Sequence, residues 1–283
     1  MYTSLGYGYR VELPTGWRRS ACQSTMELGE VPGIEAFTNA TIEEESGTDT
    51  GPANDVVIVR IEDNAGGQTA LNWLESGKMG FSVGSKFEQI TFDGNPDAAR
   101  IVTTGGVAVA YVINARFLIY AVSRGLRDPT PASNAAAAAL MTSLHILRNA
   151  ELAEARATLA SPPAPPTRSA EEVADTLARG FSQKDTSVLA TVASACLSSA
   201  LENAGAGFSA SSKFLSNMQT GFANGFVATI QARPIEFASG SRVTGATING
   251  TWKDVGQPQR NVKLMMQKAG NTWYWIGVLH LQG

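Results

Sequence analysis

The residues best able to do chemistry in this chain are two histidines, His145 and His280. An imidazole transfers protons near neutral pH when a second acid–base group lies beside it. We expect His145 at the end of a helix over residues 131–147, where the helix dipole favours it as a structural residue. His280 lies in the predicted final strand, where it either pairs with an acid inside a cavity or lies on the surface near the chain end. The surface position is the favoured one.

The cysteines and acidic residues give no pattern of a metal or cofactor site. Cys22 and Cys196 permit one disulfide outside the cytoplasm but are equally ordinary as buried thiols, which base rates favour. Their spacing matches no zinc site, and the acidic run at 43–45 lacks the ligand register of a calcium loop. No nucleophile elbow, P-loop or dinucleotide fingerprint occurs. We predict no metal, no cofactor and no enzymatic activity.

Aromatic residues near the C-terminus give a better indication of a binding site. Trp273 and Trp275 share one face of a predicted strand, and Tyr274 lies on the other. If the sheet encloses a cavity, one of these faces lines it, as in many small-molecule sites. The favoured alternative is that the aromatic rings only pack helices onto the sheet. The candidate ligand-binding residues are Trp273, Tyr274, Trp275, His280, Arg233, Glu236 and Asn249.

Composition narrows the class of protein. The 283 residues are 43% hydrophobic and 17% charged, with a net charge of −3, which is enough apolar material for two cores. The acidic balance and the lack of a basic cluster beyond Arg18-Arg19 argue against nucleic-acid binding. No apolar run reaches the roughly 18–20 residues that cross a bilayer. No signal peptide is recognisable, which fits either a cytosolic protein or an exported one whose signal has been removed.

The chain divides at a proline-rich stretch over residues 161–169, which neither a helix nor a sheet can absorb. We expect an α+β protein of two domains, each an antiparallel sheet packed with helices. The domains span 1–149 and 169–283, with a helical and proline-rich linker over 150–168. In the second domain, Ser169 and Glu172 form a capping-box pattern. Helices over about 187–200 and 210–220 and strands over 226–237, 242–253, 260–268 and 272–281 are predicted to follow.

Two stretches resemble known families. Tyr7-Gly8-Tyr9-Arg10-Val11-Glu12-Leu13-Pro14-Thr15-Gly16-Trp17 and the turn at residues 90–98 resemble the opening strand and the hairpin turn of the PsbP-like α/β/α fold. Residues 169–283 resemble the nuclear transport factor two-like, or cystatin-like, cone in helix order and in their aromatic final strand. The first resemblance implies an exported or lipid-anchored protein, which favours a removed signal. The second implies a fold shared by isomerases, dehydratases and non-catalytic binders.

The sequence therefore predicts a non-enzymatic extracytoplasmic binding or accessory protein, tethered to a membrane through a removed N-terminus or secreted. Its partner is an unknown protein or a small apolar ligand. Two alternatives stay open. One is a structural subunit of a surface assembly, and the other is an isomerase or lyase that uses His280 and an acid in the cone cavity.

Overall fold

The computed structural model describes residues 1–22, 24, 31–40, 56–76, 85–102, 108–124, 131–159, 167–201, 206–239 and 242–281. These residues form two compact units, one from the described residues before 160 and one from those after 166. The proline-rich stretch at 161–166 and the acidic run at 43–45 lie outside the described residues. Each unit is an antiparallel or mixed sheet packed with helices, so the predicted α+β class is confirmed.

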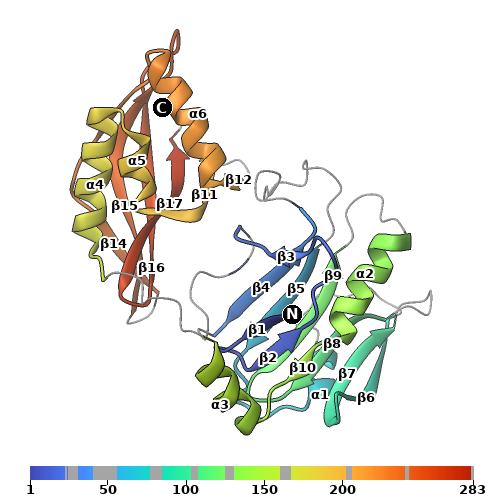
Figure 1. The fold of residues 1–283 in the computed structure, drawn as a ribbon. Coiled ribbons are helices and arrows are strands. Elements are labelled where there is room, and N and C mark those ends of the chain that lie inside the picture. Colours follow the sequence, from blue (N-terminus) through green and yellow to red (C-terminus); the bar gives the residue numbers. More distant parts are fainter. Residues whose placement is uncertain are drawn as a thin grey trace. The chain divides into compact units, whose positions relative to one another are not determined.

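The first unit is built on a seven-stranded antiparallel sheet of strand order β3-β4-β5-β9-β8-β7-β6 (Figure 1). A smaller sheet of order β1-β2-β10 belongs to the same unit. The strands are β1 (Tyr2–Ser4), β2 (Tyr9–Val11), β3 (Arg18–Arg19), β4 (Gly33–Thr38), β5 (Val56–Glu62), β6 (Lys86–Phe92), β7 (Asn95–Val102), β8 (Ala108–Asn114), β9 (Leu118–Arg124) and β10 (His145–Ile146).

Both faces of the large sheet are buried, because strand side chains alternate between two separate cores. In β9, Leu118 and Tyr120 pack in the core that includes helix α1 (Ala70–Glu75). Ile119 and Ala121 pack in the core that includes helix α2 (Pro131–Thr142) and β2. A third helix, α3 (Asn149–Thr158), follows β10 and buries Leu152.

The second unit is a seven-stranded mixed sheet of order β12-β11-β17-β16-β15-β13, with β14 also paired to β15. Only β11 and β17 run parallel; the other pairs are antiparallel. The elements are α4 (Ala170–Gln183), α5 (Thr186–Ala190), β11 (Ala193–Leu201), β12 (Ala206–Ala210), α6 (Ser211–Ala223), β13 (Val227–Ile230), β14 (Ile235–Ser239), β15 (Arg242–Lys253), β16 (Arg260–Ala269) and β17 (Thr272–His280).

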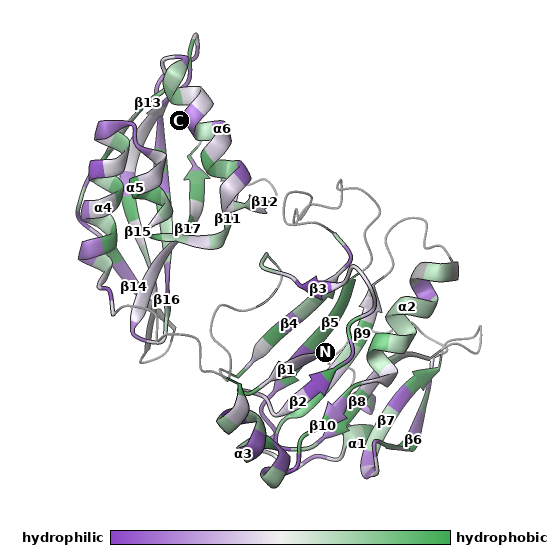
Figure 2. Cartoon of the chain, viewed as in Figure 1, coloured by the Kyte–Doolittle hydropathy of each residue, from purple (hydrophilic) through white to green (hydrophobic). Residues whose placement is uncertain are grey.

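The helices of the second unit cover one face of its sheet. Helix α4 begins with the predicted capping box, since Ser169 Oγ accepts from Glu172 N at 3.2 Å and Ser169 N donates to Glu172 Oε2 at 2.7 Å. Its buried residues include Val173, Leu177 and Phe181, while hydrophilic residues mark its outer side (Figure 2). The apolar stripe therefore packs on the sheet, as the four-residue spacing indicates.

Three predicted elements differ from the structure. Helix α2 ends at Thr142, and the next residues form β10 because Leu147 N bonds Gly8 O and β10 pairs with β2. The helix predicted over 187–200 is only the short α5, followed by β11, whose parallel pairing with β17 overrides the helix propensity of its alanines. The strand predicted over 226–237 is divided into β13 and β14 around Pro234, which has no N–H to donate.

Cys22 and Cys196 are disulfide-bonded, so the favoured interpretation as thiols is wrong. Disulfides persist in oxidising compartments and are rare in the cytosol. The covalent state of these two residues therefore favours an oxidising environment for the protein. Within the described part of the chain, no helix has the length and apolar character needed to span a bilayer.

Candidate functional site

The candidate functional site lies in the first unit, where the chain passes from α2 through β10 into α3. Leu144 and Leu147 are buried and anchor this segment, and Leu147 N donates to Gly8 O at 2.9 Å. Strand β10 pairs with β2 through His145 opposite Arg10. The segment is therefore held by backbone bonds and apolar anchors, and its polar side chains are fixed in place.

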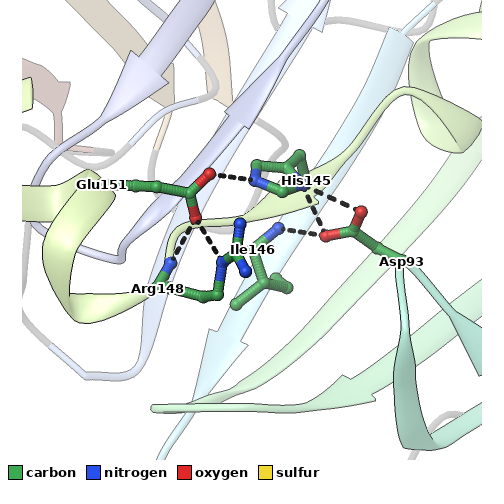
Figure 3. A network of polar contacts seen from close by, with 5 residues as sticks. All are labelled: Asp93, His145, Ile146, Arg148 and Glu151. Atoms are coloured by element: carbon green, nitrogen blue, oxygen red, sulfur yellow. Dashed lines mark hydrogen bonds and ion pairs between the residues drawn. The ribbon is translucent and has the colours of Figure 1, made fainter.

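His145 lies between two carboxylates (Figure 3). Its Nδ1 is 2.7 Å from Asp93 Oδ2, and its Nε2 is 3.1 Å from Glu151 Oε1. Asp93 lies in the β6–β7 turn with φ of 49°, and its Oδ2 also accepts from Ile146 N at 2.9 Å. Asp93 thus ties both the imidazole and the backbone of β10 to the large sheet.

Glu151 joins His145 to the start of α3. Its second oxygen, Oε2, accepts from Arg148 N at 2.9 Å and from Arg148 Nε at 3.1 Å. These donors, the Arg148 side chain first and then its backbone and His145, lower the pKa of Glu151 to about 2. The same contact raises the pKa of Arg148 above its ordinary value. The network is therefore a chain of charge-assisted hydrogen bonds from the β6–β7 turn to the first turn of α3.

The arrangement limits what His145 does chemically. Each ring nitrogen faces a carboxylate oxygen, and only the doubly protonated imidazolium donates from both nitrogens. Neither nitrogen is free to exchange a proton with a substrate in this geometry. Among the described residues, no group of histidine, cysteine, aspartate and glutamate side chains is arranged to hold a metal ion. The network therefore orders this segment of the chain.

Beside the network, the surface has a hollow of about 470 Å³, lined by Gly8, Arg116, Ile146, Leu147, Arg148 and Asn149. Arg116 lies in the turn between β8 and β9, and its Nη2 donates to Asn149 Oδ1 at 3.3 Å. A Cβ on Gly8 would lie 4.0 Å from Arg116 Nη1, and Gly8 has φ of +75°, a conformation that favours glycine. Turn, strand and helix start thus meet at one hollow with both polar and apolar walls.

A second polar group lies in the interior of the first unit. Glu35 of β4 is fully buried and accepts hydrogen bonds from Tyr2 Oη at 2.5 Å and from Tyr9 Oη. Arg19 Nε lies 3.4 Å from Glu35 Oε1. Burial first, and then the neighbouring carboxylate, raise the pKa values of both tyrosines. This Glu35 cluster (Glu35, Tyr2, Tyr9 and Arg19) joins the small sheet to the large one and is a structural element.

The residues predicted as a binding site are divided between the two faces of the second sheet. Trp273 and Trp275 are buried under the helices, and the Trp275 ring lies 6.0 Å from Phe181 and 5.7 Å from Phe214. Tyr274 is half-buried on the opposite face. The tryptophans therefore fill the space between helices and sheet with their own rings.

The polar residues of the predicted site do not converge either. Glu236 of β14 is paired with Ala246 of β15, a core residue, so both side chains lie on the core face of the sheet. Asn249 lies on the opposite face of β15. Arg233 is exposed in the loop that precedes β14. Glu236 and Asn249 therefore lie on opposite faces of the sheet.

His280 faces the core side of the sheet at the end of β17. Its ring lies 5.6 Å from that of Trp252, and its Nε2 is 3.4 Å from Ser199 Oγ. Burial lowers the pKa of His280, the positive charge of Arg260 lowers it further, and the negative charge of Asp254 raises it in part. Its Nδ1 is buried without a hydrogen-bond partner among the described residues. Among the described residues, no carboxylate is therefore hydrogen-bonded to His280, as the isomerase alternative would need.

Sequence reasoning missed the contacts of His145 and the Glu35 cluster. The predicted helix over 131–147 placed His145 at a helix end, and no local pattern links it to Asp93, 52 residues away. Glu35 occupies a strand position between apolar neighbours, and the alternation of that strand was the one available signal. Arg116 and Arg148 carry no motif at all.

No protein-family model and no curated protein matches the sequence. Among solved structures, a DUF4783 family protein from Bacteroides uniformis shares 11% identity, covering 38% of this chain and 95% of that one, with a TM-score of 0.28. A protein of unknown function with a cystatin-like fold from Nostoc punctiforme shares 16% identity, covering 39% of this chain and 85% of that one, with a TM-score of 0.28. An NTF-2 like protein of unknown function from Shewanella oneidensis shares 13% identity, covering 39% of this chain and 94% of that one, with a TM-score of 0.29.

Part of the chain is thus similar to solved proteins, one described as having a cystatin-like fold and one as NTF-2 like, both of unknown function. At these identities and TM-scores, the likeness carries no argument about activity. These matches give no support to the PsbP-like resemblance of the first unit, which stays a prediction.

Proposed function

We propose that this protein is a non-enzymatic binding or accessory protein of an oxidising, extracytoplasmic compartment, and that it recognises its partner at the hollow of the first unit. The observation that carries the proposal is the hollow itself, where Arg116, Arg148 and Asn149 present polar side chains beside Ile146 and Leu147. Polar groups around a small apolar wall are the usual composition of a recognition site.

The surrounding residues support binding rather than catalysis. Both nitrogens of His145 are engaged by carboxylates, and Glu151 is held by three hydrogen bonds. Side chains fixed in this way give a rigid wall to a binding site. The disulfide-bonded state of Cys22 and Cys196 supports the oxidising compartment.

The test is a thermal-shift screen of small molecules against the wild-type chain and two variants. Arg116→Ala removes a guanidinium from the hollow, and Arg179→Ala removes an exposed arginine of α4 as a matched control. We expect at least one compound to raise the melting temperature of the wild type and the Arg179 variant but not of the Arg116 variant. The compound should be recovered unchanged.

Two results would contradict the proposal. One is a screen in which every stabilising compound acts equally on the Arg116 variant, because recognition would then lie elsewhere. The other is chemical conversion of a bound compound that His280→Asn abolishes. That outcome would favour an enzyme acting in the second unit instead.

A further inference from the structure

The six residues that line the hollow include two guanidinium groups and no carboxylate. Arg148 has a counter-charge in Glu151, at 3.1 Å. Arg116, by contrast, pairs with no carboxylate among the described residues, and it donates to the neutral side-chain carbonyl of Asn149. The hollow therefore carries an excess of positive charge at Arg116, in a position that a ligand can reach.

The start of α3 adds hydrogen-bond donors to the same hollow. The first amides of a helix have no intrahelical acceptor and are usually satisfied by a capping side chain. Here the N-cap is Arg148, whose guanidinium has no acceptor for the helix amides; Glu151 reaches back to the N-cap backbone as in a capping box, and the Asn149 side chain accepts from Arg116. The backbone amide of Arg148 donates to Glu151 Oε2 at 2.9 Å. The helix start therefore lies beside Arg116 with its first amides free of intrahelical acceptors, and the Glu151 carboxylate in the first turn offsets part of its positive charge.

The size and the walls of the hollow limit the ligand. A volume of about 470 Å³ accommodates a small organic molecule but not a folded partner. Ile146 and Leu147 supply apolar contacts next to the charged groups. A carboxylate has two oxygens, which one guanidinium binds completely, whereas a phosphate group keeps further oxygens for the helix amides.

We propose that this hollow binds the phosphate group of a small phosphorylated molecule, between the Arg116 guanidinium and the first turn of α3. The inference rests on the proposed function and names the ligand class for the same site. The phosphate group forms charge-assisted hydrogen bonds with Arg116, and the rest of the molecule lies against Ile146. Rigidity of the site comes from the His145 network, which holds Arg148 and the helix start in place.

The test uses the full chain and three probes at constant ionic strength: inorganic phosphate, glycerol phosphate and acetate. Titration calorimetry gives the dissociation constants, and amide chemical shifts of Asn149 and Ala150 report the place of binding. We expect glycerol phosphate to bind more tightly than inorganic phosphate, with dissociation constants on the order of millimolar or below. Arg116→Gln should weaken both by about tenfold or more, and Arg179→Gln should leave them unchanged.

Arg116→Lys keeps a charge but loses the planar fork, so it should give an intermediate affinity. Circular dichroism melts confirm that each variant is folded. Vesicles that contain phosphatidic acid distinguish a lipid source of the phosphate group: binding to vesicles but not to glycerol phosphate would overturn the small-molecule assignment.

The outcomes separate this inference from the proposed function. Acetate binding as tightly as either phosphate, or phosphate binding that Arg116→Gln leaves intact, would refute the phosphate assignment. If neutral compounds bind at Arg116 while phosphates do not, the proposed function stands and this inference fails. If no probe and no screened compound shifts Asn149 or Ala150, both fail.

Discussion

Replacing the fully buried Glu35 with alanine should destabilise the first unit by about 3 kcal/mol. Its carboxylate accepts hydrogen bonds from Tyr2 and Tyr9 and lies 3.4 Å from Arg19 Nε. Each hydrogen bond to a charged group contributes about 1.5–3 kcal/mol, so the two tyrosines give about 3–6 kcal/mol. Removal of the buried charge offsets part of this loss, because its desolvation cost also disappears.

The matched variant is Glu35→Gln, which keeps the shape and one acceptor oxygen. Its amide group donates to one tyrosine oxygen and accepts from the other, so both hydroxyls stay bonded. We expect a loss of about 1 kcal/mol, since the hydrogen bonds become neutral ones. The order of stability should therefore be wild type, then glutamine, then alanine.

Native-state hydrogen exchange, read peptide by peptide, measures the effect in the correct unit. Amides of β4 and β5 should exchange about 100-fold faster in Glu35→Ala, the factor that corresponds to about 3 kcal/mol. Peptides from β16 belong to the second unit and serve as an internal reference. A change of less than about threefold in β4, or an alanine variant as protected as glutamine, would refute the structural role of the Glu35 cluster.

Three further predictions concern pH, packing and covalent structure. The pKa of Tyr9 is raised in the folded state, so its contribution to stability is present below the ordinary tyrosine pKa of about 10 and is lost as the pH rises above it. The free energy of unfolding of the first unit, measured by urea melts, should therefore fall at alkaline pH. It should fall less steeply with pH in Tyr9→Phe. A Cβ on Gly277, at φ of +153°, would lie 2.3 Å from a backbone oxygen of β11, so Gly277→Ala should cost several kcal/mol in thermal melts, on the order of 3. Gly256→Ala, with open space around it, should cost about 1 kcal/mol. Cys22 and Cys196 are both disulfide-bonded, so reduction should add the mass of two hydrogen atoms to the intact chain; an unchanged mass would contradict this state.

Regular elements with a strong local signal were predictable from the sequence. The capping box at Ser169 and the apolar spacing of α4 specify that helix locally, since both depend on residues within a few turns. The strand over 242–253 has the bounds that the sequence predicts. Helix propensity failed over 187–200, because the strand pairing that decides that segment is made with β17, about 80 residues later.

The candidate site needed the folded chain for a different reason. Arg116, Arg148 and Asn149 are ordinary polar residues in the sequence, and they line one hollow because β10 pairs with β2 and seats α3 beside the β8–β9 turn. Their function depends on distances between segments, which no spacing along the chain encodes.

The sequence by itself determined the α+β class, the helix caps and the alternation that buries Trp273 and Trp275, because backbone geometry and side-chain period act over short stretches. Tertiary structure alone decided which face those tryptophans fill, that His145 lies between Asp93 and Glu151, and that Arg116 is left without a carboxylate partner among the described residues. The physical reason is that electrostatic pairing and burial depend on proximity in space, and proximity is fixed only when distant strands pair and pack.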